Sequence, residues 1–447
     1  MNVAVMKTKA ETALTEGFDR VQSALPGGPE ARRARREAIG RFAAVGLPHR
    51  RIEEWKYTDL RGALKDAFPA AVGGAAETAT TTIADVIVAL GPLARLDLPR
   101  IVFVNGIYRG DLTNLDSAKG LSVRPLSSLL DGEAGAGVLN GHDPDADASL
   151  VALNAAYATD GAVIDVPAGG AAGRPLLVAH VRTGAEAKFV AARNVIRIGK
   201  GAHATIVEAF VQVPGSAVDG QQSTVTTVTV ADGACLDHIK VARDAGSVTH
   251  LADWSVTLGD GAVYRGFQLT AGVGLARNDI RVLYDGEDAK LDLSGTFLAR
   301  KSEHIDTTLV VDHAVRGGES RELFKGVLDD AARGVFQGKV IVRPDAQKTD
   351  GKQMAQALML SEDAEFDSKP ELEIYADDVA CGHGSTSAAL DDDLLFYLRA
   401  RGIPLDQARG LLIQSFVGEA IDKVEDEGIR EALAEMAADW LAALVAR

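Results

Sequence analysis

The chain has 447 residues, more than a single hydrophobic core usually organises, so several structural regions are expected. Apolar residues make up 47% of it and charged residues 25%, as in ordinary globular proteins. The formal charge of −16 repels phosphate backbones and argues against nucleic-acid binding. No apolar run reaches the length of about 18 uncharged residues that a membrane-spanning helix needs.

Cysteine usage and the N-terminus indicate the compartment. Cys235 and Cys381 are the two cysteines, too few for a disulfide framework, and they favour a reducing environment. The first 20 residues carry lysines and acidic side chains and lack the apolar segment of a signal peptide. A soluble cytoplasmic protein is therefore expected.

Residues 1–68 have a helical composition rich in Ala, Glu, Arg and Leu. The run 26–29 (Pro-Gly-Gly-Pro) separates one predicted helix from the next, and Gly46-Leu47-Pro48 ends the second. Residues 69–160 are predicted to be a linker followed by a mixed α/β segment. The linker is the Ala-, Gly- and Thr-rich stretch 70–82.

Residues 161–390 contain a repeated phrase: a turn made by Gly or Asp, an alanine, and then a strand with alternating apolar residues. The intervals between the alanines are 32, 28, 27, 42 and 33 residues, at Ala202, Ala234, Ala262, Ala289, Ala331 and Ala364. A strand–turn–strand unit of this length is typical of a parallel β-solenoid (β-helix), whose coils must stack to bury their apolar faces. A β-sandwich is the alternative.

Residues 391–447 change to helical periodicity. One predicted helix precedes Gly402 and Pro404, a second carries the apolar stripe 408–420, and a third covers about 427–445. A solenoid needs a cap at its open end. These helices could cap it, bind a partner, or do both.

Motifs for independent catalysis are absent from the sequence. There is no GxxxxGK(S/T) phosphate loop and no HExxH, CxxC or GxSxG motif. Acidic pairs such as Asp377-Asp378 leave open a carbohydrate-active β-helix protein, although the 5% of aromatic residues provide few platforms for sugars. A non-catalytic protein is the better prediction.

Cys381 and His383 form the one constellation with evident chemistry. Residues two apart in a strand face the same side, so a thiol and an imidazole would lie side by side. Both suit Fe, Zn or Cu, but two ligands cannot close a tetrahedral site, so the others would come from a second subunit. The alternative is a buried cysteine and a hydrogen-bonded histidine in a Gly-rich turn. Cys235 with His238 nearby is a weaker version of the same pattern.

Four segments together resemble the SufB/SufD family: 54–58 (EWKYT), 369–374 (KPELEI), 381–384 (CGHG) and 395–403 (LFYLRARGI). The Cys-x-His-Gly form is that of the SufD-like members. The resemblance implies a mainly β protein, a right-handed parallel β-helix over 161–390 between N-terminal and C-terminal helical regions. It also implies a non-catalytic scaffold for iron–sulfur cluster assembly.

The resemblance further implies two partners. SufB, a homologous β-helix, would pair side by side with this chain, and the SufC ATPase would bind the C-terminal helical region 391–447. Within that region the expected SufC contacts are Leu395, Phe396, Tyr397, Leu398, Arg399, Arg401, Gly402, Ile403, Ala408, Leu411, Leu412 and Phe416.

A transient Fe–S cluster shared with SufB is implied at the interface, with His383 as a ligand and Cys381 as a nearby candidate. No stable cofactor is expected for the isolated chain, which could form a homodimer, and a reduced flavin could take part in the complex. A SufB-like direct sulfur acceptor is the alternative, and it would need a reactive cysteine such as Cys235.

Overall fold

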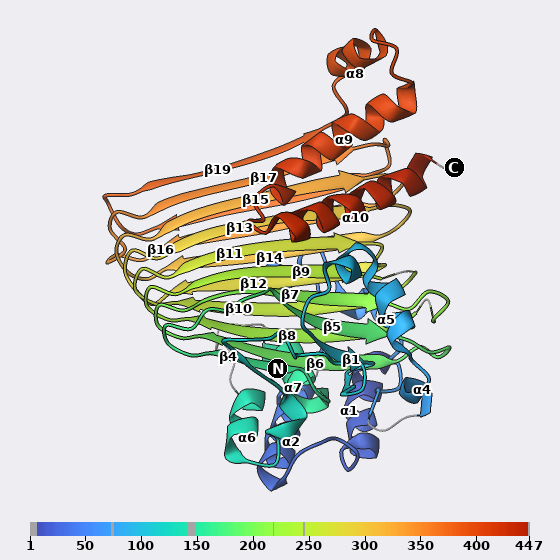
Figure 1. Cartoon of the computed structure of the whole chain (residues 1–447), viewed down its shortest axis with the longest axis vertical. Helices are drawn as coiled ribbons and strands as arrows, with labels where there is room; N and C mark the ends of the chain where they lie inside the picture. Colours follow the sequence, from blue (N-terminus) through green and yellow to red (C-terminus); the bar gives the residue numbers. More distant parts are fainter. Residues whose placement is uncertain (1–6, 73–75, 141–147, 218, 245, 446–447) are drawn as a thin grey trace, which may run out of the picture.

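The computed structural model describes residues 7–72, 76–140, 148–217, 219–244 and 246–445 of the chain. Its centre is a parallel β-solenoid of about eight turns, and helices flank it at both chain ends (Figure 1). Each turn gives one strand to each of two facing sheets, here called the even sheet and the odd sheet after their strand numbers. The predicted solenoid is confirmed. The β-sandwich alternative is wrong, because each long strand pairs in parallel with the strand one turn away.

The even sheet contains, in chain order, β3 (Ser122–Pro125), β4 (Ala162–Val166), β6 (Phe189–Ile198), β8 (Gln221–Val230), β10 (Thr249–Leu258), β12 (Leu275–Tyr284), β14 (His304–His313), β16 (Arg333–Val342) and β18 (Glu365–Ile374). The odd sheet contains β1 (Arg100–Val104), β2 (Ile107–Tyr108), β5 (Leu176–Arg182), β7 (His203–Gln212), β9 (Cys235–Arg243), β11 (Val263–Ala271), β13 (Lys290–Ala299), β15 (Glu319–Leu328), β17 (Asp350–Met359) and β19 (Ala380–Ala388). Strands β1 and β3 thus join the sheets from the segment predicted as linker and mixed structure.

Parallel register explains why β-branched residues dominate the interior. One ladder across the even sheet stacks a buried aliphatic side chain on the same position of the next turn: Ile196, Val228, Val256, Val282, Val311 and Val340. Stiff branched side chains pack well on such a pleated surface. Burying each contributes about 1.5 kcal/mol, so the stack as a whole holds the turns together.

The alanines of the repeat are stacked at the turns, with one correction. Ala202, Ala234, Ala262 and Ala289 are buried and in register, each following a residue with positive φ. The phrases near 331 and 364 instead lie in turns at the opposite edge of the coil, which explains the irregular 42-residue interval. There the buried alanine is Ala332, not the predicted Ala331, because it is Ala332 that stacks on Ala364.

N-terminal helices cover the outer face of the even sheet, from its first turns up to β18, where Lys369 pairs with Glu53. They are α1 (Lys9–Val21), α2 (Pro29–Val45), α3 (Leu60–Ala63), α6 (Glu133–Asn140) and α7 (Ala148–Tyr157), with the short 3-10 helix η1 (Glu53–Trp55), and α7 packs on β6 and β8. The predicted linker 70–82 includes α4 (Ala76–Ala79), and its residues 73–75 lie outside the described residues. Near the odd sheet lie α5 (Ile83–Leu90) and η2 (Gly91–Leu96), and η3 (Leu126–Ser128) follows β3.

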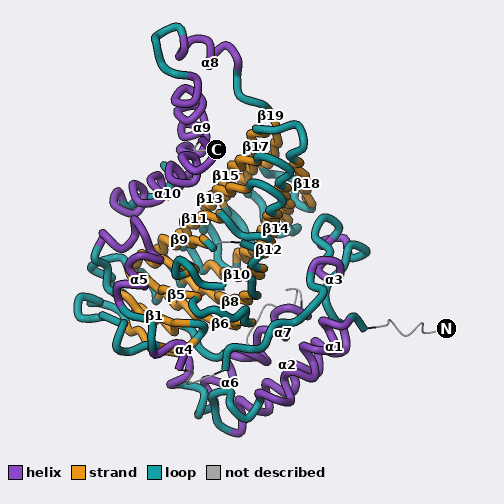
Figure 2. The backbone as a smooth tube through the Cα atoms, turned by 90° about the vertical axis from the view of Figure 1, so that its right-hand side faces the viewer, coloured by secondary structure: helices purple, strands orange, loops and turns teal. Residues whose placement is uncertain are grey.

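The three predicted C-terminal helices are present as α8 (Asp392–Arg399), α9 (Leu405–Ile421) and α10 (Glu427–Val445). Helix α9 packs on β13 and β15 along the outer face of the odd sheet, on the side opposite α1 to α3 (Figure 2). The last turn, β18 and β19, is therefore not covered by α9 or α10, and α8 projects beyond it (Figure 1). Within the described residues, no helix is both long and apolar enough to cross a bilayer.

Candidate functional site

Cys381 and His383 lie on β19, the last strand of the odd sheet, as the strand spacing predicted. They are in register with Gly351 and Gln353 on β17. The Gln353 amide donates to the carbonyl of Gly338 on the opposite sheet, so this side of the ladder points into the solenoid. Both ligand-type side chains therefore point between the two sheets at the uncapped end, and they lie in a strand rather than in a Gly-rich turn.

The surroundings of the pair are open. A shallow depression of about 530 Å³ is lined by residues 352–354 and 379–384. Gly351 places no side chain beside the thiol, and a Cβ there would lie 3.7 Å from Cys381 Sγ and in tight contact with Ser320 Oγ, at 3.3 Å. The His383 side chain is exposed and makes no hydrogen bond to another described residue. Both side chains are accessible to an incoming ligand or partner.

Electrostatics leave the Cys381 thiol protonated in the isolated chain. Burial raises its pKa, the carboxyl groups of Asp350 and Glu322 raise it further, and only the Gly351 backbone lowers it. A nucleophilic thiolate normally needs the opposite, a pKa lowered by nearby positive charge. Cys381 is therefore suited to binding a metal that displaces its proton, not to spontaneous nucleophilic attack.

Glu322 is a residue that the sequence analysis missed. It lies in the His383 ladder, in register with Gln353, and is 3% exposed. Neither of its carboxylate oxygens accepts a hydrogen bond of normal geometry. Burial raises its pKa to about 8, against partial lowering by Ser320 and Arg321. The sequence feature that could have identified Glu322 is an acidic residue at a position of the strand where alternation predicts an inward-facing apolar side chain.

Among the described residues, no strand neighbours the outer edges of β18 and β19. Ala380 donates its N–H to the carbonyl of Thr349, directly before β17. The residues of β19 that alternate with Ala380, Ser385 among them, therefore direct their N–H groups to the open side. On β18, the residues whose backbone groups point to the open edge include Pro370, which has no N–H to donate. Strand β19 thus presents the edge with its full set of donors.

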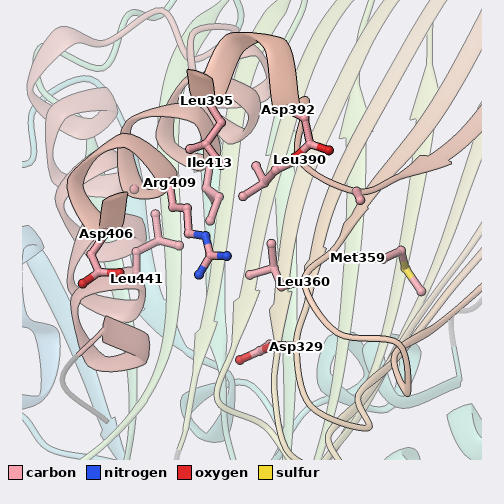
Figure 3. A pocket seen from close by; sticks show the side chains of 12 residues that line it. Asp329, Met359, Leu360, Leu390, Asp392, Leu395, Asp406, Arg409, Ile413 and Leu441 are labelled. Carbon is pink, nitrogen blue, oxygen red and sulfur yellow. The ribbon is translucent and has the colours of Figure 1, made fainter. Parts of the chain in front are cut away.

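A second candidate surface is α8, which has no buried residue. Phe396 is 75% exposed and Tyr397 53%, and the Arg401 guanidinium lies 3.4 Å from the centre of the Tyr397 ring. Beneath α8, a cavity of about 420 Å³ lies between α8, part of α9 and the edge of the solenoid. Leu395 on α8 and Ile413 on α9 line one side of it, and Leu360, which follows β17, lines the other (Figure 3).

The twelve residues predicted to contact an ATPase partner divide by exposure. Phe396, Tyr397, Arg399, Arg401, Gly402 and Leu411 are exposed. Leu395, Leu398, Ile403, Leu412 and Phe416 are half-buried. Ala408 is fully buried, so it packs inside the helical region instead of presenting a surface.

Cys235 and His238 are not brought together. They are three residues apart on β9, so they face opposite sides of the odd sheet. His238 lies inside the solenoid, where its Nε2 is 2.9 Å from Glu208 Oε2 and its Nδ1 is 3.0 Å from the Tyr264 hydroxyl. Cys235 lies on the outer face beside Asp237.

Two family models match the chain. The core domain of SufBD proteins, of the SUF system for Fe–S cluster assembly, covers residues 180–416, and the SufBD N-terminal region covers 28–178. The chain is 32% identical to the iron–sulfur cluster assembly protein SufD of Escherichia coli over 87% of this chain and 88% of that protein. It is 31% identical to a SufBD family protein of Synechocystis over 87% and 86%, and 26% identical to SufD of Bacillus subtilis over 64% and 65%. The chain therefore belongs to the SufBD family of iron–sulfur cluster assembly proteins, and within it to the SufD type.

Proposed function

We propose that this chain is a non-catalytic scaffold that pairs with SufB through the edge of its last solenoid turn and binds the SufC ATPase through α8 and α9. A nascent Fe–S cluster, the cargo of the complex, would form where the two solenoids meet. One observation carries the proposal: Cys381 and His383 lie on the terminal strand, and no strand in the described part of the chain pairs with its outer edge.

The chemistry of the pair supports a shared site. A thiolate and an imidazole are both iron ligands, and two ligands leave coordination positions for a partner to fill. Iron would displace the proton from the Cys381 thiol, which is otherwise kept protonated because burial raises its pKa. The alternative of a direct sulfur acceptor is less well supported, since burial also raises the pKa of Cys235, and neither thiol has the lowered pKa of a nucleophile.

The proposed SufC surface has the composition of a protein-binding site. Exposed aromatic residues and arginine are the residue types that dominate binding energy, and α8 with the turn that follows it offers Phe396, Tyr397 and Arg401 together. Helix α9 connects this surface to the solenoid: Lys325 on β15 pairs with Glu419 at 2.6 Å and lies 4.3 Å from the centre of the Phe416 ring. A movement of SufC would reach the odd sheet through α9.

Co-purification of the chain with its SufB and SufC tests the two surfaces separately. Ser385→Pro removes one outward N–H of β19 and is expected to weaken SufB binding at least tenfold while SufC stays bound. Phe396→Asp is expected to do the reverse, since a truncated aromatic anchor costs about 2 kcal/mol or more.

Matched controls are Ser385→Ala, which keeps the N–H, and Val45→Asp, which changes an exposed apolar residue on α2. Both should bind SufB and SufC like the wild type. Loss of both partners in either test variant, or of neither partner in both, would overturn the assignment of surfaces.

A further inference from the structure

Three ligand-type side chains meet on the outer face of the odd sheet, away from the Cys381 site. His203 begins β7 and Cys235 begins β9, and the two are register partners. Asp237 lies two residues after Cys235, on the same face. One ligand atom from each of the three lies within 4.8 Å of the others, and His203 Nε2 is 4.0 Å from Asp237 Oδ2.

We propose that His203, Cys235 and Asp237 bind a divalent transition-metal ion of the Fe²⁺ or Zn²⁺ class. Imidazole, thiolate and carboxylate are the three side-chain donors found in Zn²⁺ sites, and thiolate excludes Mg²⁺ and Ca²⁺ as the preferred ions. Three protein ligands leave a fourth position for water or a partner's group.

The three ligand atoms need to move only a short distance toward one another to bind a metal ion. Ligand atoms in a tetrahedral site lie about 3.3–3.8 Å apart, given bonds of about 2.0–2.3 Å. The three groups must therefore close by about 1 Å. The His203 side chain is 48% exposed, so it can rotate toward Cys235 and Asp237 without disturbing the core.

The surrounding charges favour a divalent cation. Arg265 on β11 holds Asp237 with two hydrogen bonds, from Nε to Oδ1 at 2.6 Å and from Nη2 to Oδ2 at 3.0 Å. A carboxylate has further lone pairs for a metal, and such partners commonly fix the orientation of metal ligands. Glu425, in the connection between α9 and α10, lies close enough to act on both Cys235 and Arg265. Lys423 and Asp426 line the same depression as Asp237 and Arg265 and carry opposite charges. With Cys235 as a thiolate, the group as a whole has four negative and two positive charges, and a divalent ion neutralises the difference.

This site is independent of the proposed assembly function. It lies on the outer face of β7 and β9, whereas Cys381 and His383 lie inside the last turn. The competing explanation is that Arg265 and Asp237 form only a stabilising ion pair, with Cys235 packed beside it. The two explanations differ in whether Cys235 donates to an added metal.

Anaerobic titration of the full chain with Co²⁺ tests the proposal, since thiolate coordination gives a near-ultraviolet charge-transfer band. Wild type is expected to bind one equivalent with this band, and Zn²⁺ is expected to displace it. Cys235→Ser should abolish the band. His203→Ala, at a half-exposed position that tolerates change, should weaken binding at least about tenfold.

Cys381→Ser is the matched control and should keep the band unchanged, because Cys381 and His383 supply only two ligands when SufB is absent. A band that persists in Cys235→Ser, or that is absent from the wild type, would overturn the site. Circular dichroism of each variant establishes that the fold is retained. If Cys235→Ser does not fold, His203→Ala decides: unchanged Co²⁺ affinity would overturn the proposal.

Discussion

Replacing Arg277 with alanine is expected to lower the free energy of unfolding by about 3–5 kcal/mol. Arg277 is 1% exposed on β12 and donates to Asp279 at 3.0 and 3.2 Å and to Asp306 at 2.6 Å. Its guanidinium also lies 4.1 Å from the centre of the Trp55 ring. Removing the cation would leave two buried carboxylates without their counter-charge, which costs far more than the loss of the attraction alone.

Urea unfolding of wild type and Arg277→Ala measures this effect. The matched control is Arg333→Ala on β16, where a partly exposed arginine pairs with Asp367 and Glu365. That variant is expected to lose at most about 1 kcal/mol, because solvent screens the pair. Equal losses in the two variants would contradict the buried-network account. Trp55 fluorescence should also shift to the red in Arg277→Ala alone.

Glu322→Gln is expected to remove a large pH dependence of stability. Burial raises the pKa of Glu322 in the folded state to about 8, from its ordinary value of 4.5. A carboxyl with a raised folded-state pKa contributes stability that is fully present below pH 4.5 and is lost as the pH rises toward 8. At about 1.4 kcal/mol per pKa unit, the loss is on the order of 3–5 kcal/mol by pH 9.

Urea unfolding from pH 5 to pH 9 measures the difference. The two proteins should agree within about 1 kcal/mol at pH 5, where Glu322 is neutral, and Glu322→Gln should be the more stable at pH 9. The matched control is Glu319→Gln on the same strand, whose exposed carboxylate pairs with Lys290. It should follow the wild-type profile. Parallel profiles of wild type and Glu322→Gln would mean that Glu322 is solvated in the folded protein.

The fold could be predicted largely because a solenoid repeats itself. The alanine phrases and the β-branched runs predict the same local structure at every turn, so the length of the repeat can be recognised in a single sequence. Two details could not be read from the sequence. The repeat does not show which edge of the coil a turn occupies, and the phrases at 331 and 364 belong to the opposite edge. Nor does helical periodicity show where a helix packs, and α9 and α10 cover the side of the solenoid rather than its end.

The candidate site was predictable only where it is local in sequence. Cys381 and His383 share one strand, so their spacing alone puts them on one face. Glu322 reaches the same ladder through a register that the sequence does not state. The pairing of Cys235 with His203, 32 residues apart, likewise needs the register, whereas the spacing of three to His238 should have excluded His238 as its partner.

Anaerobic cluster assembly in the complex with SufB and SufC tests the central claim most directly, by comparing wild type with His383→Ala. The matched control is Thr386→Ala, an exposed residue of β19 that faces away from the solenoid interior. We expect all three complexes to form with the same composition and the cluster yield to fall at least tenfold in His383→Ala only. An intact His383→Ala complex with an unchanged yield would contradict the ligand role, and failure of the wild type to form any complex would contradict the scaffold itself.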